Sequence, residues 1–167
     1  MIRLNKVSFC LGESNDGSSV RFDLPSFEVE TGEAVALTGP SGCGKSTLLN
    51  LVSGLRRTNT GEITVAGVDL ATLSPAQLDK HRGEHCGMVF QNFHLLAPFT
   101  AIENVAIGLR FGSRKASNAL KRATQVLRRV GLSGRLDFRP NQLSVGERQR
   151  VAIARAIAGD AKILLAD

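Results

Sequence analysis

The chain has 167 residues, of which 43% are hydrophobic and 22% are charged, and its formal net charge is +6. This composition is typical of one globular domain and excludes disordered, collagen-like and coiled-coil chains. No apolar run approaches the roughly 18 residues of a membrane span, and residues 1–6 lack the apolar segment of a signal peptide, so we expect a cytoplasmic location. Three widely spaced cysteines predict reduced thiols rather than disulfides.

The first part of the chain predicts strands around a glycine-rich loop. Residues 2–11 and 20–29 have strand-like patterns and flank a Gly/Ser-rich stretch, which predicts a hairpin. Residues 34–38 form a short apolar run, as expected of a strand buried on both faces. Residues 46–52 follow the glycine-rich loop and predict a helix, and residues 61–67 predict another strand.

The remainder of the chain alternates between helical and strand patterns. Ser74-Pro75 predicts a helix start, and residues 86–91 predict a buried strand. The region from 93 to 143 is helical and strand-poor, which indicates a subdomain inserted into the core. A helix is predicted for residues 144–158, and a last strand for 162–166. Strands that alternate with helices predict an α/β fold with a mostly parallel sheet.

One motif in this pattern has a clear chemical meaning. Residues 39–46 (GPSGCGKS) match G-x-x-x-x-G-K-[ST] between a predicted strand and a predicted helix. Such a loop surrounds a triphosphate with backbone N–H groups, because its glycines remove the Cβ atoms that would intrude, and the helix N-terminus adds its dipole. The predicted nucleotide site comprises nine consecutive residues: Gly39, Pro40, Ser41, Gly42, Cys43, Gly44, Lys45, Ser46 and Thr47.

Three side chains of this loop have predicted roles in binding or catalysis. Lys45 brings a cation to the β- and γ-phosphates, where negative charge grows during phosphoryl transfer, so we regard it as catalytic. The hydroxyl of Ser46 is placed for Mg²⁺, and Thr47 lies on the side of the α-phosphate.

A second motif, residues 143–150 (LSVGERQR), marks the start of a helix. Ser144 and Glu147 form an S-x-x-E capping box before an apolar run. A serine hydroxyl and the amide of Gly146 at a helix N-terminus would also bind a phosphate. The residues by themselves leave both interpretations open, an ordinary capped helix and a phosphate contact.

Four stretches of the sequence follow one another in a single order: GPSGCGKST, a strand ending in Gln91, LSVGERQR, and KILLAD ending in Asp167. In this combination the chain resembles, over essentially its whole length, the nucleotide-binding domain of ATP-binding cassette (ABC) transporters. The stretches GMVFQNFHLLAPFTAIENV and RVAIARAI are most similar to the lipoprotein-release and macrolide-export group. The resemblance implies a P-loop NTPase core with an N-terminal antiparallel β part over residues 1–91, an inserted helical subdomain over 92–143, and a signature helix with the Walker B strand over 144–167.

The resemblance also implies the roles of residues outside the loop. Gln91 would reach the Mg²⁺ and the attacking water, and would couple the site to membrane subunits. Ser144 and Gly146 would contact the γ-phosphate of ATP held by a second copy, so that two domains enclose two nucleotides head to tail. Asp167 would hold Mg²⁺ through water. The expected cofactors are ATP and Mg²⁺, with Ser46, Gln91 and Asp167 at the metal.

The partners that the resemblance implies are a second nucleotide-binding domain and transmembrane permease subunits. Through these subunits the chain would lie at the inner face of the cell membrane.

Three features depart from the family pattern. The signature LSGGQ is LSVGE here, so Val145 adds a branched side chain and Glu147 adds a negative charge near the phosphates. Leu11 stands about where the family stacks an aromatic ring on adenine, and Phe9 is a possible substitute. Asp167 is the last residue, whereas the family's catalytic glutamate and switch histidine follow this aspartate. We therefore expect ATP binding, with hydrolysis slower by roughly 10²–10⁴-fold.

These observations predict the ATP-binding subunit of a membrane transport or release complex. Two alternatives remain open, a non-hydrolysing clamp that responds to ATP and a soluble cassette protein that acts on nucleic acid. The second is suggested by residues 110–155, which hold 12 Lys/Arg and 2 Asp/Glu. Apolar residues after Gln91, such as Phe93 and Phe99, favour docking to a membrane subunit instead. The chain also lacks Trp and Tyr for base stacking, so nucleic acid is not an expected partner.

Overall fold

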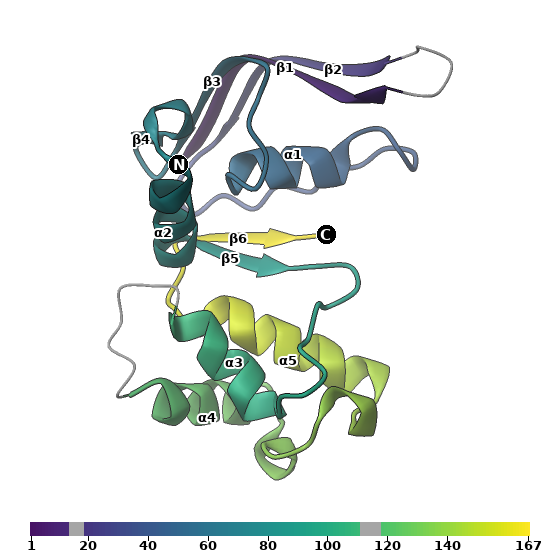
Figure 1. The fold of residues 1–167 in the computed structure, drawn as a ribbon, viewed down its shortest axis with the longest axis vertical. Coiled ribbons are helices and arrows are strands. Elements are labelled where there is room, and N and C mark those ends of the chain that lie inside the picture. The colour runs from purple at the N-terminus through teal and green to yellow at the C-terminus, as the bar shows by residue number, and fades with distance from the viewer. Residues whose placement is uncertain (14–18, 111–117) are drawn as a thin grey trace. The chain divides into compact units, whose positions relative to one another are not determined.

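The computed structural model describes residues 1–13, 19–110 and 118–167 (Figure 1). The chain forms two compact units, Met1–Leu78 and Asp79–Asp167. Within the described residues, no helix combines the length and the apolar character that a membrane span requires.

The first unit contains a four-stranded antiparallel sheet in the order β2-β1-β3-β4. Strands β1 (Ile2–Glu13) and β2 (Ser19–Val29) form the predicted hairpin. Strand β3 (Thr60–Val65) pairs with β1, and β4 (Val68–Asp69) pairs with β3 across a tight turn. The prediction of a hairpin and a further strand is therefore confirmed.

The core of the first unit lies between this sheet and helix α1 (Lys45–Val52). The alternation of β1 changes at Lys6, which has φ 49°, and the register with β3 shifts between Asn5 and Ser8. Gly61 on β3 makes this irregularity possible, because an added Cβ there would lie 2.3 Å from the Lys6 carbonyl oxygen. The buried apolar residues of β1 and α1 in this core are Ile2, Leu4, Val7, Phe9, Leu48, Leu51 and Val52.

Residues 34–38 do not form the buried strand that the sequence predicted. They have no strand conformation, and the side chain of Val35 is 45% exposed. An apolar run is buried on both faces only when a sheet holds it between other layers. None of the strands in the described residues pairs with this run, so it leads into the glycine-rich loop as an irregular segment.

Helix α2 (Pro75–His85) leads into the second unit and is followed by strand β5 (Cys86–Val89). The predicted cap is present, since Ser74 Oγ accepts from the Gln77 N–H at 3.4 Å and the Ser74 N–H donates to Gln77 Oε1 at 2.8 Å. Strand β6 (Ile163–Ala166) pairs with β5 in parallel, so that both carboxyl ends lie at the same edge.

Three helices complete the second unit and surround one apolar core. They are α3 (Ala101–Arg110), α4 (Ala119–Arg129) and α5 (Val145–Ile157), and Figure 1 shows them grouped beside β5. Gly87 lets β5 approach α5 closely, because an added Cβ would lie 2.3 Å from the Ala156 carbonyl oxygen. The expectation of a helical region between two strands is confirmed, and the fold is α/β with an antiparallel N-terminal part.

Candidate nucleotide-binding site

The glycine-rich loop lies in the first unit, immediately before α1. Gly44 precedes the helix with φ 99°, and Gly39 and Gly42 have φ values of 152° and 82°. Residues with a Cβ atom rarely adopt such positive values, so the loop requires glycine at these three positions. The nine predicted loop residues are consecutive: residues 39–44 form the irregular loop, and Lys45, Ser46 and Thr47 are the first three residues of α1.

Gly44 has a second, steric reason to lack a side chain. An added Cβ would lie 3.0 Å from Cδ2 of Phe22 on β2. The half-buried ring of Phe22 thus supports the loop from the hairpin, where it is paired with Phe9. Sequence analysis missed Phe22, and only the register of the hairpin would have indicated it.

The ammonium group of Lys45 folds back into the loop. Its Nζ donates to the carbonyl oxygens of Gly39 at 2.9 Å and Pro40 at 2.8 Å, and it lies 3.6 Å from Cys43 Sγ. A phosphate oxygen is a stronger acceptor than a neutral carbonyl. An anion that enters the loop would therefore replace these carbonyl contacts, because the cation is already in position.

The first turn of α1 completes the features that suit an anion. It contains no acidic residue, so nothing opposes the positive end of the helix dipole. Ser46 is exposed in this turn, whereas Thr47 is buried. The exposed hydroxyl of Ser46 fits the predicted role of an oxygen ligand for Mg²⁺.

Gln91 and Asp167 lie at the same edge of the parallel strand pair in the second unit. Val89 is opposite Ala166 at the end of the ladder, and the N–H of Asp167 donates to the Val89 carbonyl at 3.0 Å. Both Gln91 and Asp167 are exposed. The structure thus brings these two predicted metal residues to one edge, and both carry the hard oxygen atoms that Mg²⁺ prefers.

The signature motif forms the capped start of α5. The Glu147 N–H donates to Ser144 Oγ at 3.2 Å, and the Ser144 N–H donates to Glu147 Oε2 at 2.8 Å. The predicted capping box is therefore confirmed. Val145 is 61% exposed, so its branched side chain lies on the surface and leaves the cap undisturbed.

The negative charge of Glu147 is paired within the chain. Arg135 Nε donates to Glu147 Oε1 at 2.9 Å, and the same guanidinium lies 4.8 Å from the centre of the Phe138 ring. The Ser144 N–H, followed by Arg135, holds the pKa of Glu147 below its usual range. Sequence analysis missed Arg135, which offsets the charge that departs from the family signature.

The segment after Gln91 is held by an asparagine that sequence analysis also missed. Asn104 on α3 is 1% exposed. Its Oδ1 accepts from the Leu96 N–H at 2.7 Å, and its Nδ2 donates to the carbonyls of Leu96, Phe99 and Thr100 at 3.0–3.1 Å. Leu96 and Phe99 remain exposed (44% and 38%), so the asparagine fixes a loop that presents apolar side chains.

The structure does not place Phe9 or Leu11 as a residue that stacks on adenine. Phe9 is only 9% exposed, and the Arg56 guanidinium lies 5.2 Å from the centre of its ring. The ring is therefore part of the core, and the structure does not support a stack on adenine. The side chain of Leu11 lies outside the described residues.

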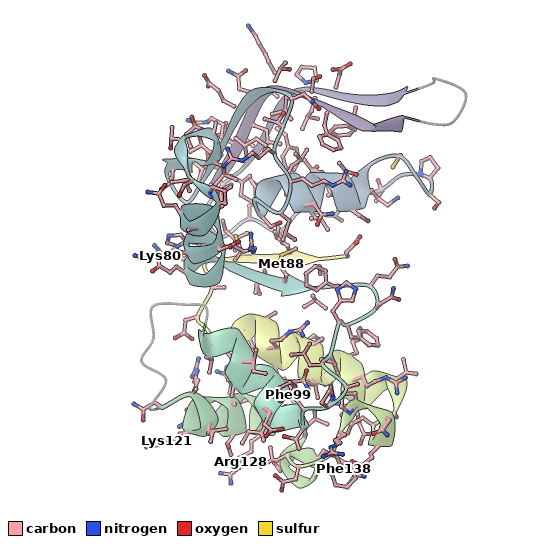
Figure 2. The ribbon with its side chains drawn as sticks, viewed as in Figure 1. Lys80, Met88, Phe99, Lys121, Arg128 and Phe138 are labelled. Atoms are coloured by element: carbon pink, nitrogen blue, oxygen red, sulfur yellow. The ribbon has the colours of Figure 1, made fainter. Side chains whose placement is uncertain are left out.

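Several of the nine Lys and Arg residues between 118 and 155 form hydrogen bonds within the chain. The guanidinium groups of Arg122, Arg135 and Arg148 each donate to carbonyl or carboxylate oxygens of the second unit. Lys121 and Arg128 are exposed and project from α4 (Figure 2). These bonds hold three of the guanidinium groups to the second unit, so they are less free to contact the phosphates of a nucleic acid.

A comparison with protein families decides the identity of this domain. The family model described as ABC transporter matches residues 22–167. The chain belongs to the ABC transporter family. The resemblance that the two motifs and their spacing indicated is thus confirmed.

The curated relatives include transport and lipoprotein-release proteins. The macrolide export ATP-binding/permease protein MacB of Rhodopirellula baltica is 47% identical over 152 residues, which cover 87% of this chain and 22% of that protein. The lipoprotein-releasing system ATP-binding protein LolD of Chromohalobacter salexigens is 46% identical over 145 residues, covering 87% of this chain and 61% of that protein. The chain therefore spans less than two thirds of the length of these relatives.

A solved structure confirms the fold of this ABC chain. A dimeric ATP-binding cassette in a post-hydrolysis state, bound to ADP and Pi, matches with a TM-score of 0.90 at 35% identity. The match covers all of this chain and 73% of the solved one. The predicted P-loop NTPase architecture is thus confirmed.

Proposed function

We propose that this chain is the ATP-binding part of an ABC transporter that couples ATP binding and hydrolysis to transport or lipoprotein release by membrane subunits. The observation that carries the proposal is the loop before α1. Three of its glycines have positive φ, and the Lys45 ammonium group folds back onto the carbonyl oxygens of Gly39 and Pro40. The names of the curated relatives support the link to transport.

In the proposed mechanism, Lys45 exchanges its two carbonyl acceptors for phosphate oxygens of ATP. Mg²⁺, when bound, offsets the negative charge of the phosphates. Ser46, Gln91 and Asp167 would hold the metal, the aspartate through water. The hydroxyl, amide and carboxylate oxygens of these residues are the ligand types that Mg²⁺ selects. Gln91 would also orient the attacking water.

A second copy of the domain completes the proposed site. Ser144 and Gly146 at the start of α5 would contact the γ-phosphate of ATP held by that copy. Helix N-termini bind anions through their free N–H groups, and Arg135 already offsets the charge of Glu147 near this end. The dimeric state of the solved relative supports this arrangement.

Membrane subunits are the other proposed partner. The loop fixed by Asn104 presents Leu96 and Phe99 to solvent, and an exposed apolar loop favours a protein contact. Through such subunits the chain would lie in the cytoplasm, at the inner face of the membrane.

Calorimetric titration with Mg-ATP tests the proposal directly. The wild-type chain is compared with Lys45→Met, which keeps the aliphatic stem and loses the cation, and with Lys121→Met, which removes the same charge from an exposed position on α4. We expect wild-type and Lys121→Met to bind alike and Lys45→Met to bind at least about tenfold more weakly, since a charge-assisted bond is lost. A folded wild-type chain that ignores millimolar Mg-ATP would contradict the proposal.

A further inference from the structure

Two residues shortly after Gln91 have an unusual backbone conformation. Phe93 has φ 60° and His94 has φ 43°, and neither is a glycine. Consecutive left-handed residues with side chains are strained and persist only where surrounding contacts impose them. The contacts that impose this turn therefore also determine where Gln91, two residues earlier in the chain, is placed.

Arg155 on α5 makes contacts to both of these residues. Its Nη2 donates to the Phe93 carbonyl at 2.6 Å, and its Nη1 donates to the His94 carbonyl at 2.7 Å. The planar guanidinium carries both donors in a fixed fork, so it holds the two carbonyls in one relative orientation. Arg155 is half-buried, and this burial lowers the pKa of its guanidinium.

The side chain of Arg155 passes close to Gly108 on helix α3 on its way to the loop. An added Cβ on Gly108 would lie 2.9 Å from Cγ of Arg155 and 3.6 Å from its carbonyl oxygen. The stem of Arg155 thus passes against a glycine in the interior of a helix, where alanine would ordinarily be more stable. The glycine and the arginine together form a support for the turn.

We propose that Arg155 is a positioning residue for Gln91, which acts by holding the Phe93 and His94 carbonyls in the left-handed turn. The inference rests on the proposed function, because Gln91 has its role only at a bound nucleotide. Helix α5, which starts at the signature motif, then also holds the loop that follows Gln91. One helix therefore carries both elements, about 16 Å apart along its axis.

The geometric part of the proposal is tested by amide hydrogen exchange on the chain without nucleotide. The reporters are the Phe93 N–H, which donates to Phe90 O at 2.8 Å, and the His94 N–H, which donates to Asn92 O at 2.6 Å. In Arg155→Met we expect both to exchange roughly 10- to 100-fold faster, the loss typical of bonds to a charged group. Unchanged protection of the two amides would overturn the proposal.

Arg122→Met is the matched control for exchange. Arg122 also donates to a main-chain carbonyl, that of Ala158 at 3.1 Å, and to Asp160 Oδ1 at 2.5 Å. Its loss should leave the Phe93 and His94 amides protected. Equal loosening of these amides in both variants would show a general destabilisation and overturn the specific role of Arg155.

Two milder variants keep the test decisive if Arg155→Met does not fold. Arg155→Lys retains the charge but replaces the fork by one flexible ammonium, so it should restore only part of the protection. Gly108→Ala leaves the arginine in place and displaces its stem, so it should loosen the same two amides. Full protection in both variants would refute the proposal.

The functional part is tested by the ratio of ATP affinities with and without Mg²⁺. We expect Gln91→Ala and Arg155→Met each to lower this ratio, and the double variant to lower it no further than Gln91→Ala alone. If the two substitutions instead lower the ratio independently, so that their effects multiply in the double variant, Arg155 does not act through Gln91 and this part of the proposal is overturned. A wild-type chain that binds no ATP would instead refute the proposed function, while the exchange experiment would still decide whether Arg155 holds the turn.

Discussion

Replacing Asn104 by aspartate tests whether this buried amide fixes the apolar loop after Gln91. Aspartate has nearly the same shape and keeps an oxygen for the Leu96 N–H, but it has no Nδ2 donor. The carbonyls of Leu96, Phe99 and Thr100 would then face a carboxylate instead of an amide. The substitution therefore isolates the donated hydrogen bonds from the packing of the side chain.

The magnitude follows from the number of groups that lose a partner. The Thr100 carbonyl also accepts from the Asn104 N–H at 2.9 Å, so it stays bonded. The Leu96 carbonyl likewise keeps its bond from the Phe99 N–H at 3.1 Å, so the Phe99 carbonyl is the group that loses its bond to this side chain, which is 1% exposed. At about 1–3 kcal/mol for an unsatisfied buried group, the free energy of unfolding should fall by about 1–3 kcal/mol. Such a loss is a measurable part of the roughly 5–15 kcal/mol that stabilises a domain.

Urea unfolding followed by far-ultraviolet circular dichroism measures this loss, because the chain contains no Trp or Tyr for intrinsic fluorescence. Asn141→Asp is the control, since Asn141 is exposed in the same unit and should change stability by less than about 0.5 kcal/mol. If the free energy of unfolding of Asn104→Asp stays within about 1 kcal/mol of the wild-type value, the bonds donated by Asn104 do not stabilise the loop as proposed.

Three further predictions concern the loop, a buried thiol and the signature. Gly44→Ala should weaken Mg-ATP binding and lower the thermal midpoint, because φ is 99° there and the new Cβ would press on Phe22; Gly134→Ala, with open space around it, should change neither. Burial raises the pKa of Cys86 from 9.0 to about 11, so the unfolded chain ionises first, and stability should fall by about 2 kcal/mol as the pH rises from 9 to 11. Cys86→Ser should remove this slope in urea unfolding, and an identical slope in both proteins would contradict the prediction. The pKa of Glu147 is held below its ordinary 4.5, so its stabilisation is present above that pH and is lost as the pH falls. Glu147→Gln should flatten the thermal midpoint between about pH 3 and 5, and an unaltered profile would show that the cap and Arg135 do not act on this carboxylate.

Features that depend on neighbours in the sequence could be predicted from the residues alone. The phosphate-binding loop is one example, because its glycines, Lys45 and the helix start are consecutive and their geometry is set by local backbone conformation. The capping box of Ser144 and Glu147 is another, since both partners lie in one helical turn. The β1–β2 hairpin was also predicted, from two strand patterns separated by turn residues.

Contacts between distant residues were decided only by the tertiary structure. Arg155 donates to carbonyls more than 60 positions away, and Arg135 meets Glu147 across 12 positions, and no periodic pattern encodes either pairing. Residues 34–38 show that a local pattern can also predict too much. Their apolar run predicts a strand, but none of the strands in the described residues pairs with it. Local sequence fixes backbone conformation and the bonds within a turn, whereas burial and long-range partners depend on which segments the fold brings together.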